Sequence, residues 1–302
     1  MTRVLEKIRR HGILGSAHKA INLFQRISSR VYHKWRCRNA LVYAEPTPDE
    51  LVVIEQDMCA LNINIDDYAP DSAAFKRFQD EEWFPLDYHG GQDSGVWDEK
   101  LLEHWLSSER LGLMNYGKDD IFVDVAAACS PWAKTLRERK DLSTFAIDLD
   151  EVGPVYRQLP YYRVENATKT SFQNASVTGV ALHCAYEMFM RDDDTNLLRE
   201  LARILKPGGK AIIAPLYLHT HYSSYSSPKY YGKGYSDPLA KEYLYSEWDG
   251  IPSARFYDAN ELNNRVLKPI ESLGMHYKLL ALRNKDSFGK GIYCHFILEI
   301  ER

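Results

Sequence analysis

The sequence lacks the cysteine pairs that mark a disulfide-stapled or zinc-binding protein. Its five cysteines are odd in number, lie far apart and never form a C-x-x-C pair, so neither a disulfide framework nor a zinc site is predicted. No apolar run approaches the roughly 18 to 20 residues that span a bilayer, and no secretory signal is recognisable. These absences predict a cytoplasmic protein.

Acidic and basic residues are unevenly distributed along the 302 residues. The formal net charge is -4, yet residues 1–38 hold ten Lys or Arg and one acid, Glu6. The rest of the chain therefore carries about -13. Because phosphate backbones attract basic surfaces, no nucleic-acid partner is predicted.

The basic segment has the pattern of an amphipathic helix. From Leu14 to Trp35, apolar residues recur at three- and four-residue steps with basic residues between them, which predicts a basic helical arm over residues 1–38. One interpretation is peripheral contact with the inner face of an anionic membrane. The other is packing on the domain or on a second subunit, as in a homo-oligomer. A transit peptide is a third option.

Residues 39–112 are predicted to form a helical cap or linker. Glu45 to Pro48 breaks the helical pattern, and the stretch to Tyr88 is acidic and irregular apart from a helix over 72–79. A second helix is expected over 96–111, with Ser94 as its N-terminal cap.

Residues 113–302 alternate between short apolar runs and helical segments. Such a rhythm predicts parallel βαβ units and a doubly wound, Rossmann-like α/β sheet. The last two strands, 275–282 and 292–300, are joined by only about nine residues, which forces an antiparallel hairpin at the C-terminus. Five earlier strands are expected, near residues 121–125, 143–149, 161–164, 177–184 and 210–218.

Residues 217–250 interrupt this rhythm with an aromatic insertion. Tyrosines and Trp248 alternate there with Ser, Gly, Pro and His, a composition too polar for a core strand and too aromatic for an idle loop. We interpret the insertion as a lid over the carboxyl ends of the strands. The alternative is a segment that packs only on its own protein.

The stretch IFVDVAAACSPW, from Ile121 to Trp132, reads as a strand that turns sharply into a helix. Such a turn presents backbone N–H groups and a helix N-terminus to a nucleotide or another polar cofactor. A tight turn that serves only packing is the other interpretation.

Together with LLRELARILKPGGKAIIAPL, this stretch resembles the class I S-adenosylmethionine-dependent methyltransferases, over about 121–302. Asp124 stands in the place of the family's motif acid, while Ala126, Ala128 and Ser130 stand where three glycines are usual. The motif is therefore degenerate. The departure matters because alanine resists the positive φ that glycine adopts freely.

The resemblance also implies the remaining cofactor contacts. Asp148, after the second strand, would accept hydrogen bonds from the ribose hydroxyls, with Asp150 as the fallback. Asn166 and Ala167 would lie beside the adenine ring. The implied cofactor is S-adenosylmethionine.

The catalytic residues are harder to read. His183 and Glu187 lie where the family's substrate-facing residues stand, but a buried histidine or a solvated helix residue explains each equally well. His219 and His221 form a close pair, and either is a candidate base. No metal site is predicted, because a third and a fourth ligand for that pair are not evident.

The resemblance implies a methyltransferase that acts on a hydroxyl of a sugar or another polar small molecule. The aromatic insertion suggests the sugar, since flat rings stack on pyranose faces. The whole combination resembles methyltransferases of bacterial polysaccharide pathways, an analogy at the level of fold. The alternative is a non-catalytic binding or assembly protein on a degenerate methyltransferase fold.

Overall fold

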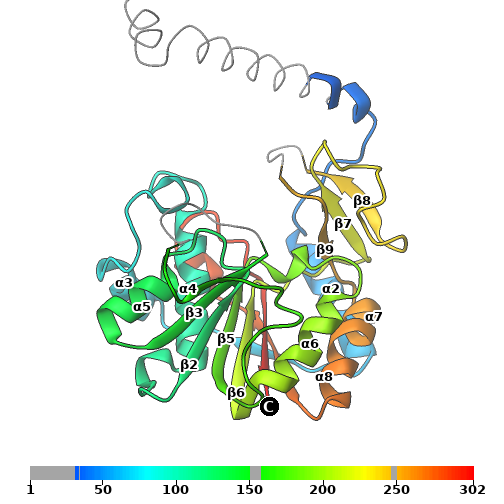
Figure 1. Cartoon of the computed structure of the whole chain (residues 1–302). Coiled ribbons are helices and arrows are strands. Elements are labelled where there is room, and N and C mark those ends of the chain that lie inside the picture. Colours follow the sequence, from blue (N-terminus) through cyan, green and yellow to red (C-terminus); the bar gives the residue numbers. More distant parts are fainter. Residues whose placement is uncertain (1–30, 34, 150–157, 246–249) are drawn as a thin grey trace, which may run out of the picture.

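The computed structural model describes residues 31–33, 35–149, 158–245 and 250–302 (Figure 1). Most of the arm predicted over residues 1–38 lies outside these ranges, and so do Asp150 and Trp248. Within the described ranges, no helix is both long and apolar enough to cross a membrane.

A mixed sheet of eight strands forms the centre of the molecule, in the order β1-β10-β11-β6-β5-β2-β3-β4. The strands β2 to β6 run parallel, whereas β11 is antiparallel to both β6 and β10. The predicted α/β fold with an antiparallel C-terminal hairpin is therefore confirmed. The strand bounds are β1 Ile65–Tyr68, β2 Ile121–Val125, β3 Ser143–Asp148, β4 Tyr162–Val164, β5 Val177–His183, β6 Leu205–Ala214, β10 His276–Leu282 and β11 Phe296–Glu301.

Helices cover both faces of this sheet, as Figure 1 shows. Alternate residues of β2 point to opposite faces of the sheet. Phe122 packs with α4 and α5, and Val123 packs in the core that contains α6 and α8. Strands covered on both faces need near-continuous apolar runs, which is what these strands have. The helix bounds are α4 Trp97–Leu111, α5 Trp132–Lys140, α6 Asp193–Ile204, α7 Ala259–Leu262 and α8 Lys268–Ser272.

The segment 39–112 contains two elements that the sequence analysis did not predict. Helix α2, Pro48–Ala60, starts with a capping box in which Thr47 and Glu50 bond each other's backbone N–H groups, at 2.8 and 3.3 Å. Strand β1 adds to the main sheet parallel to β10. Helix α3, Ser72–Asp80, and α4 lie where predicted, but Ser94 does not cap α4, which starts without a side-chain cap.

The aromatic insertion contributes β7 Ser223–Ser226 and β8 Lys241–Leu244 to a small sheet of three strands, and the third strand, β9 Ala254–Phe256, follows the insertion. Its aromatic side chains pack on one another and on Tyr43, whose ring lies 4.8 Å from Tyr225 and 5.0 Å from Phe256. The insertion, predicted as a lid loop, thus builds a second small core.

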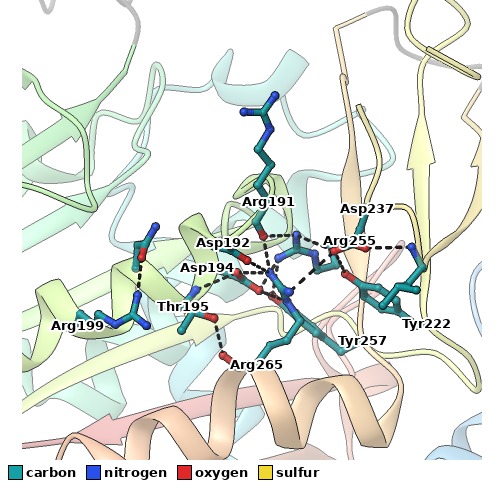
Figure 2. Close-up of polar contacts among 12 residues, drawn as sticks. Arg191, Asp192, Asp194, Thr195, Arg199, Tyr222, Asp237, Arg255, Tyr257 and Arg265 are labelled. Atoms are coloured by element: carbon teal, nitrogen blue, oxygen red, sulfur yellow. Dashed lines mark hydrogen bonds and ion pairs between the residues drawn. The ribbon is translucent and has the colours of Figure 1, made fainter. Parts of the chain in front are cut away.

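A buried ionic network fastens this small sheet to the main domain (Figure 2). Asp194, at the start of α6, is fully buried and accepts hydrogen bonds from Tyr257 Oη at 2.8 Å and from Arg265 Nη2 at 2.8 Å. It also forms an ion pair with Arg255 of β9. Arg255 Nη2 donates in turn to the backbone carbonyl of Arg191 at 2.7 Å. Three chain segments, around Asp194, Arg255 and Arg265, therefore meet at one carboxylate.

Candidate functional site

The turn after β2 adopts the conformation of a glycine-rich loop although it contains alanines. Ala126 has φ +54° and Ala128 has φ +44°, so the alanines accept the left-handed region that the sequence analysis expected them to resist. An L-residue in that region costs about 1–2 kcal/mol. The Ala128 N–H donates to Asp148 Oδ2 at 2.8 Å, which ties the turn to the end of β3.

Ser130, at the third glycine position, has a different role. Its φ is not positive, and its hydroxyl accepts the Trp132 N–H at 3.2 Å at the beginning of α5. The same hydroxyl lies 3.2 Å from His104 Nε2. The serine thus supplies a polar contact at the start of α5 that glycine would not.

We expect Ala126→Gly to raise the free energy of unfolding by about 0.5–1 kcal/mol. Glycine relieves the left-handed strain, and the extra entropy of the unfolded chain takes back about 0.4–1 kcal/mol of that gain. Urea denaturation measures the difference. The matched control is Ala127→Gly: this neighbour is buried and has no positive φ, so glycine there should destabilise the protein. Equal effects of both substitutions would contradict the strain argument.

The proposed cofactor residues gather at the carboxyl ends of β2, β3 and β4. Asp148 ends β3, and its backbone carbonyl accepts the Glu165 N–H at 2.9 Å, which brings the loop after β4 alongside. Asn166 is exposed there, with its side-chain oxygen bonded to the Thr168 N–H at 2.9 Å. Ala167 is buried. The structure therefore brings these residues together with the alanine turn.

Beneath the turn lies a buried polar cluster made of Asp124, His183, Ser107 and His104. His183 Nδ1 lies 3.0 Å from Asp124 Oδ1, and His183 Nε2 lies 2.7 Å from Ser107 Oγ. The rings of His104 and His183 stack with centroids 4.0 Å apart. Burial lowers the pKa of His183 to about 3 and raises that of Asp124 to about 6. Both imidazoles are therefore neutral at neutral pH, since burial also lowers the pKa of His104.

Glu187 is buried and lies in a short 3-10 turn, Tyr186–Met188, that follows β5. Its Oε1 accepts a hydrogen bond from Cys184 Sγ at 3.5 Å, and Cys184 also lies 3.2 Å from Tyr217 Oη. Burial raises the pKa of Glu187 to about 7. A carboxyl that titrates near neutral pH suits proton transfer.

Helix α4 and Tyr293 contribute further polar side chains near Cys184. Lys100 Nζ donates to Glu103 Oε1 at 2.8 Å, and Tyr293 Oη donates to the same oxygen at 3.3 Å. Tyr293 Oη also lies 3.8 Å from Cys184 Sγ. These α4 residues are absent from the predicted site, although polar side chains recur there at three- and four-residue spacing, in Lys100, Glu103, His104 and Ser107.

The pair His219 and His221 lies elsewhere. Their rings are 4.3 Å apart, and His221 Nε2 lies 2.8 Å from Tyr243 Oη on β8. Thr220, between them, lines a surface hollow of about 260 Å³ next to α2. No contact found among the described residues joins this pair to His183 or Glu187, so the structure does not bring the four candidate catalytic residues together.

Comparison with known proteins gives the site a context. Residues 113–213 match a methyltransferase domain. The matched segment holds the alanine turn, the end of β3, His183 and Glu187, but it is only about a third of the chain. A search of curated proteins finds no match. The match covers β2 to β5 and most of β6, whereas the antiparallel strand β11 lies outside it.

Two of the solved structures similar to this chain are methyltransferases. An N1-methyltransferase of Burkholderia thailandensis, with S-adenosylhomocysteine bound, is 13% identical and has a TM-score of 0.43, with 79% of this chain and 92% of that chain covered. Geranyl diphosphate C-methyltransferase of Streptomyces coelicolor is 15% identical and has a TM-score of 0.40, with 86% and 99% covered. At such identities and scores, neither likeness carries an argument about the activity or the substrate of this chain.

Proposed function

We propose that this chain is an S-adenosylmethionine-dependent methyltransferase that methylates a hydroxyl of a sugar or another polar small molecule, with a role in glycan biosynthesis. The carrying observation is the turn after β2. It adopts the positive φ values of a glycine loop at Ala126 and Ala128 and bonds the carboxylate of Asp148. That carboxylate lies at the partly exposed end of β3, where a ribose diol would find a two-oxygen acceptor.

Glu187 is the better of the two candidate bases near the end of β5. His183 has both ring nitrogens in contact with buried polar groups, and a pKa of about 3 makes it a poor proton acceptor at neutral pH. Glu187, with a pKa of about 7, has one carboxylate oxygen, Oε2, without a hydrogen-bond partner among the described residues. In this proposal Glu187 accepts the proton of the acceptor hydroxyl while the methyl group is transferred in line.

Contact with a membrane or a second subunit belongs to the same proposal. The described end of the arm exposes Val31, Tyr32 and Trp35, each by more than half. Arg36 holds this end to the aromatic insertion through the backbone carbonyl of Tyr231 at 2.7 Å. Removal of residues 1–38 should abolish sedimentation with anionic vesicles if the arm binds lipid. Unchanged lipid binding would dismiss this contact, and a smaller oligomeric mass would favour subunit packing.

Calorimetry with S-adenosylmethionine tests the proposed activity. Asp148→Ala should weaken binding about 10- to 100-fold, because a hydrogen bond to a charged group contributes about 1.5–3 kcal/mol. Asp148→Asn, which keeps one acceptor oxygen, should fall in between, and Asp80→Ala on α3 is the surface control. An affinity unchanged in Asp148→Ala would refute the ribose assignment. A folded protein that binds no cofactor at millimolar concentration would favour the non-catalytic alternative.

A further inference from the structure

We propose that His104, Asp124 and His183 bind a divalent transition-metal ion of the zinc class. One ligand atom from each of the three side chains lies within 4.8 Å of the others. His104 and Asp124 are 1% exposed, and the His183 side chain is 6% exposed. The residues come from α4, β2 and β5, so no spacing in the sequence announces the set.

The hydrogen bonds of His104 leave one ring nitrogen as an acceptor. Its Nδ1 lies 2.7 Å from the backbone carbonyl of Lys100. A carbonyl can only accept, so the proton of the neutral ring is on Nδ1. The lone pair on Nε2 therefore faces the cluster, where the hydroxyl of Ser130 is its one hydrogen-bonding contact.

His183 can adopt either neutral tautomer. Ser107 Oγ lies 3.0 Å from the backbone carbonyl of His104 and 2.7 Å from His183 Nε2. When the Ser107 hydroxyl donates to the carbonyl, its oxygen accepts from His183 Nε2, and the lone pair of the ring is on Nδ1, 3.0 Å from Asp124 Oδ1. When the hydroxyl donates to Nε2, the ring carries its proton on Nδ1 and donates it to Asp124.

In the first tautomer, three electron-pair donors converge without a cation between them. Asp124 Oδ2 has no hydrogen-bond partner among the described residues, and a buried carboxylate oxygen without one is costly. A bound metal ion would hold His183 in this tautomer, whereas without an ion the ring donates its Nδ1 proton to Asp124. The contacts of Lys100 with His104 and of Ser107 with His183 are of the kind that orient metal-binding histidines.

Two imidazoles and one carboxylate suit zinc and its neighbours, whereas Mg²⁺ and Ca²⁺ prefer sets made only of oxygen. Zinc-to-ligand bonds of about 2.0–2.2 Å place tetrahedral ligand atoms about 3.3–3.6 Å apart, so the set, which lies within 4.8 Å, must contract around the ion. One of the stacked rings must also turn about its Cβ–Cγ bond, a soft torsion. Ser130 or a water molecule would complete four ligands. Such an ion would fix α4 to the strand ends directly below the alanine turn.

The test uses the full-length protein and needs no activity. The chain is stripped with a chelator, incubated with one equivalent of Zn²⁺ or Co²⁺ and passed through a desalting column. We expect one ion per chain by elemental analysis, and the intense visible absorption of a low-symmetry Co²⁺ site. An ion content below one fifth per chain overturns the proposal and leaves the hydrogen bond from His183 Nδ1–H to Asp124 as the explanation.

Variants locate the ion if it is retained. His104→Asn and Asp124→Asn should abolish uptake, and Ser107→Ala should weaken it about 10- to 100-fold, as loss of an orienting contact does. His276→Asn, at the exposed start of β10, is the matched control. Uptake by either ligand variant at the level of the parent would place the ion elsewhere and refute the site. Circular dichroism of each variant excludes misfolding as the cause.

Discussion

Asp194→Ala is expected to lower the free energy of unfolding by about 3–5 kcal/mol, the usual cost of removing one partner from a buried ion pair. The substitution leaves Arg255, which is 4% exposed, with only the more distant carboxylate of Asp237, at 4.0 Å. Tyr257 loses the acceptor of its hydroxyl at the same time. Urea denaturation followed by circular dichroism measures the loss.

Asp192→Ala is the matched control for this prediction. Asp192 contacts the same Arg265, at 3.5 Å, but its side chain is 82% exposed. An exposed ion pair contributes about 0–1 kcal/mol, so the control should be close to the parent. If the two substitutions cost the same, the network does not fasten the small sheet in the way the structure indicates.

Glu187→Gln is expected to lower kcat about 10²- to 10⁴-fold, the range that general base catalysis provides. Glutamine keeps the shape and the contact with Cys184 but accepts no proton at neutral pH. In the parent, kcat should rise with pH through about 7 and then level off, because only the ionised carboxylate is a base. Steady-state kinetics between about pH 5.5 and 9, with the acceptor in excess, would measure both the fall in kcat of the variant and the pH dependence of kcat in the parent.

The stability of Glu187→Gln shows whether its low activity comes from the missing base or from misfolding. Burial raises the pKa of Glu187 from its ordinary value of 4.5 to about 7 in the folded protein. The folded state therefore prefers the protonated carboxyl, and stability falls as the pH rises from 4.5 to about 7. Glutamine removes this penalty, so the inactive variant should be more stable than the parent at pH 8. Glu138→Gln, on the surface of α5, should change neither property. A Glu187→Gln enzyme with full activity would exclude the carboxylate as base.

Some features of the fold were missed although the sequence carried a signal for them. The capping box of α2 is visible as Thr47-x-x-Glu50, but the acidic composition around it favours an irregular segment. Strand β1 is different, because its sequence IDDY has neither apolar alternation nor high strand propensity. It is a strand because β10 offers an edge for it to pair with, and no local pattern encodes that.

The candidate site also contains parts that the sequence predicts and parts that it does not. Asp124 and Asp148 were placed correctly at strand ends, since the carboxyl ends of parallel strands share one edge of a sheet. The lid interpretation of the insertion rested on composition alone. Tyrosines in a loop and tyrosines in a small core have the same composition, and only the packing of Tyr43 on Tyr225 and Phe256 distinguishes them.

The sequence by itself determined the α/β alternation, the C-terminal hairpin and the place of the turn after β2, because each depends on residues close together in the chain. The tertiary structure decided that Ala126 and Ala128 adopt left-handed conformations, since the flanking β2 and α5 fix the path of the turn. It also decided that His104 meets His183, about 80 residues away. Contacts across such separations arise from the packing of α4 on the sheet, which no local pattern specifies.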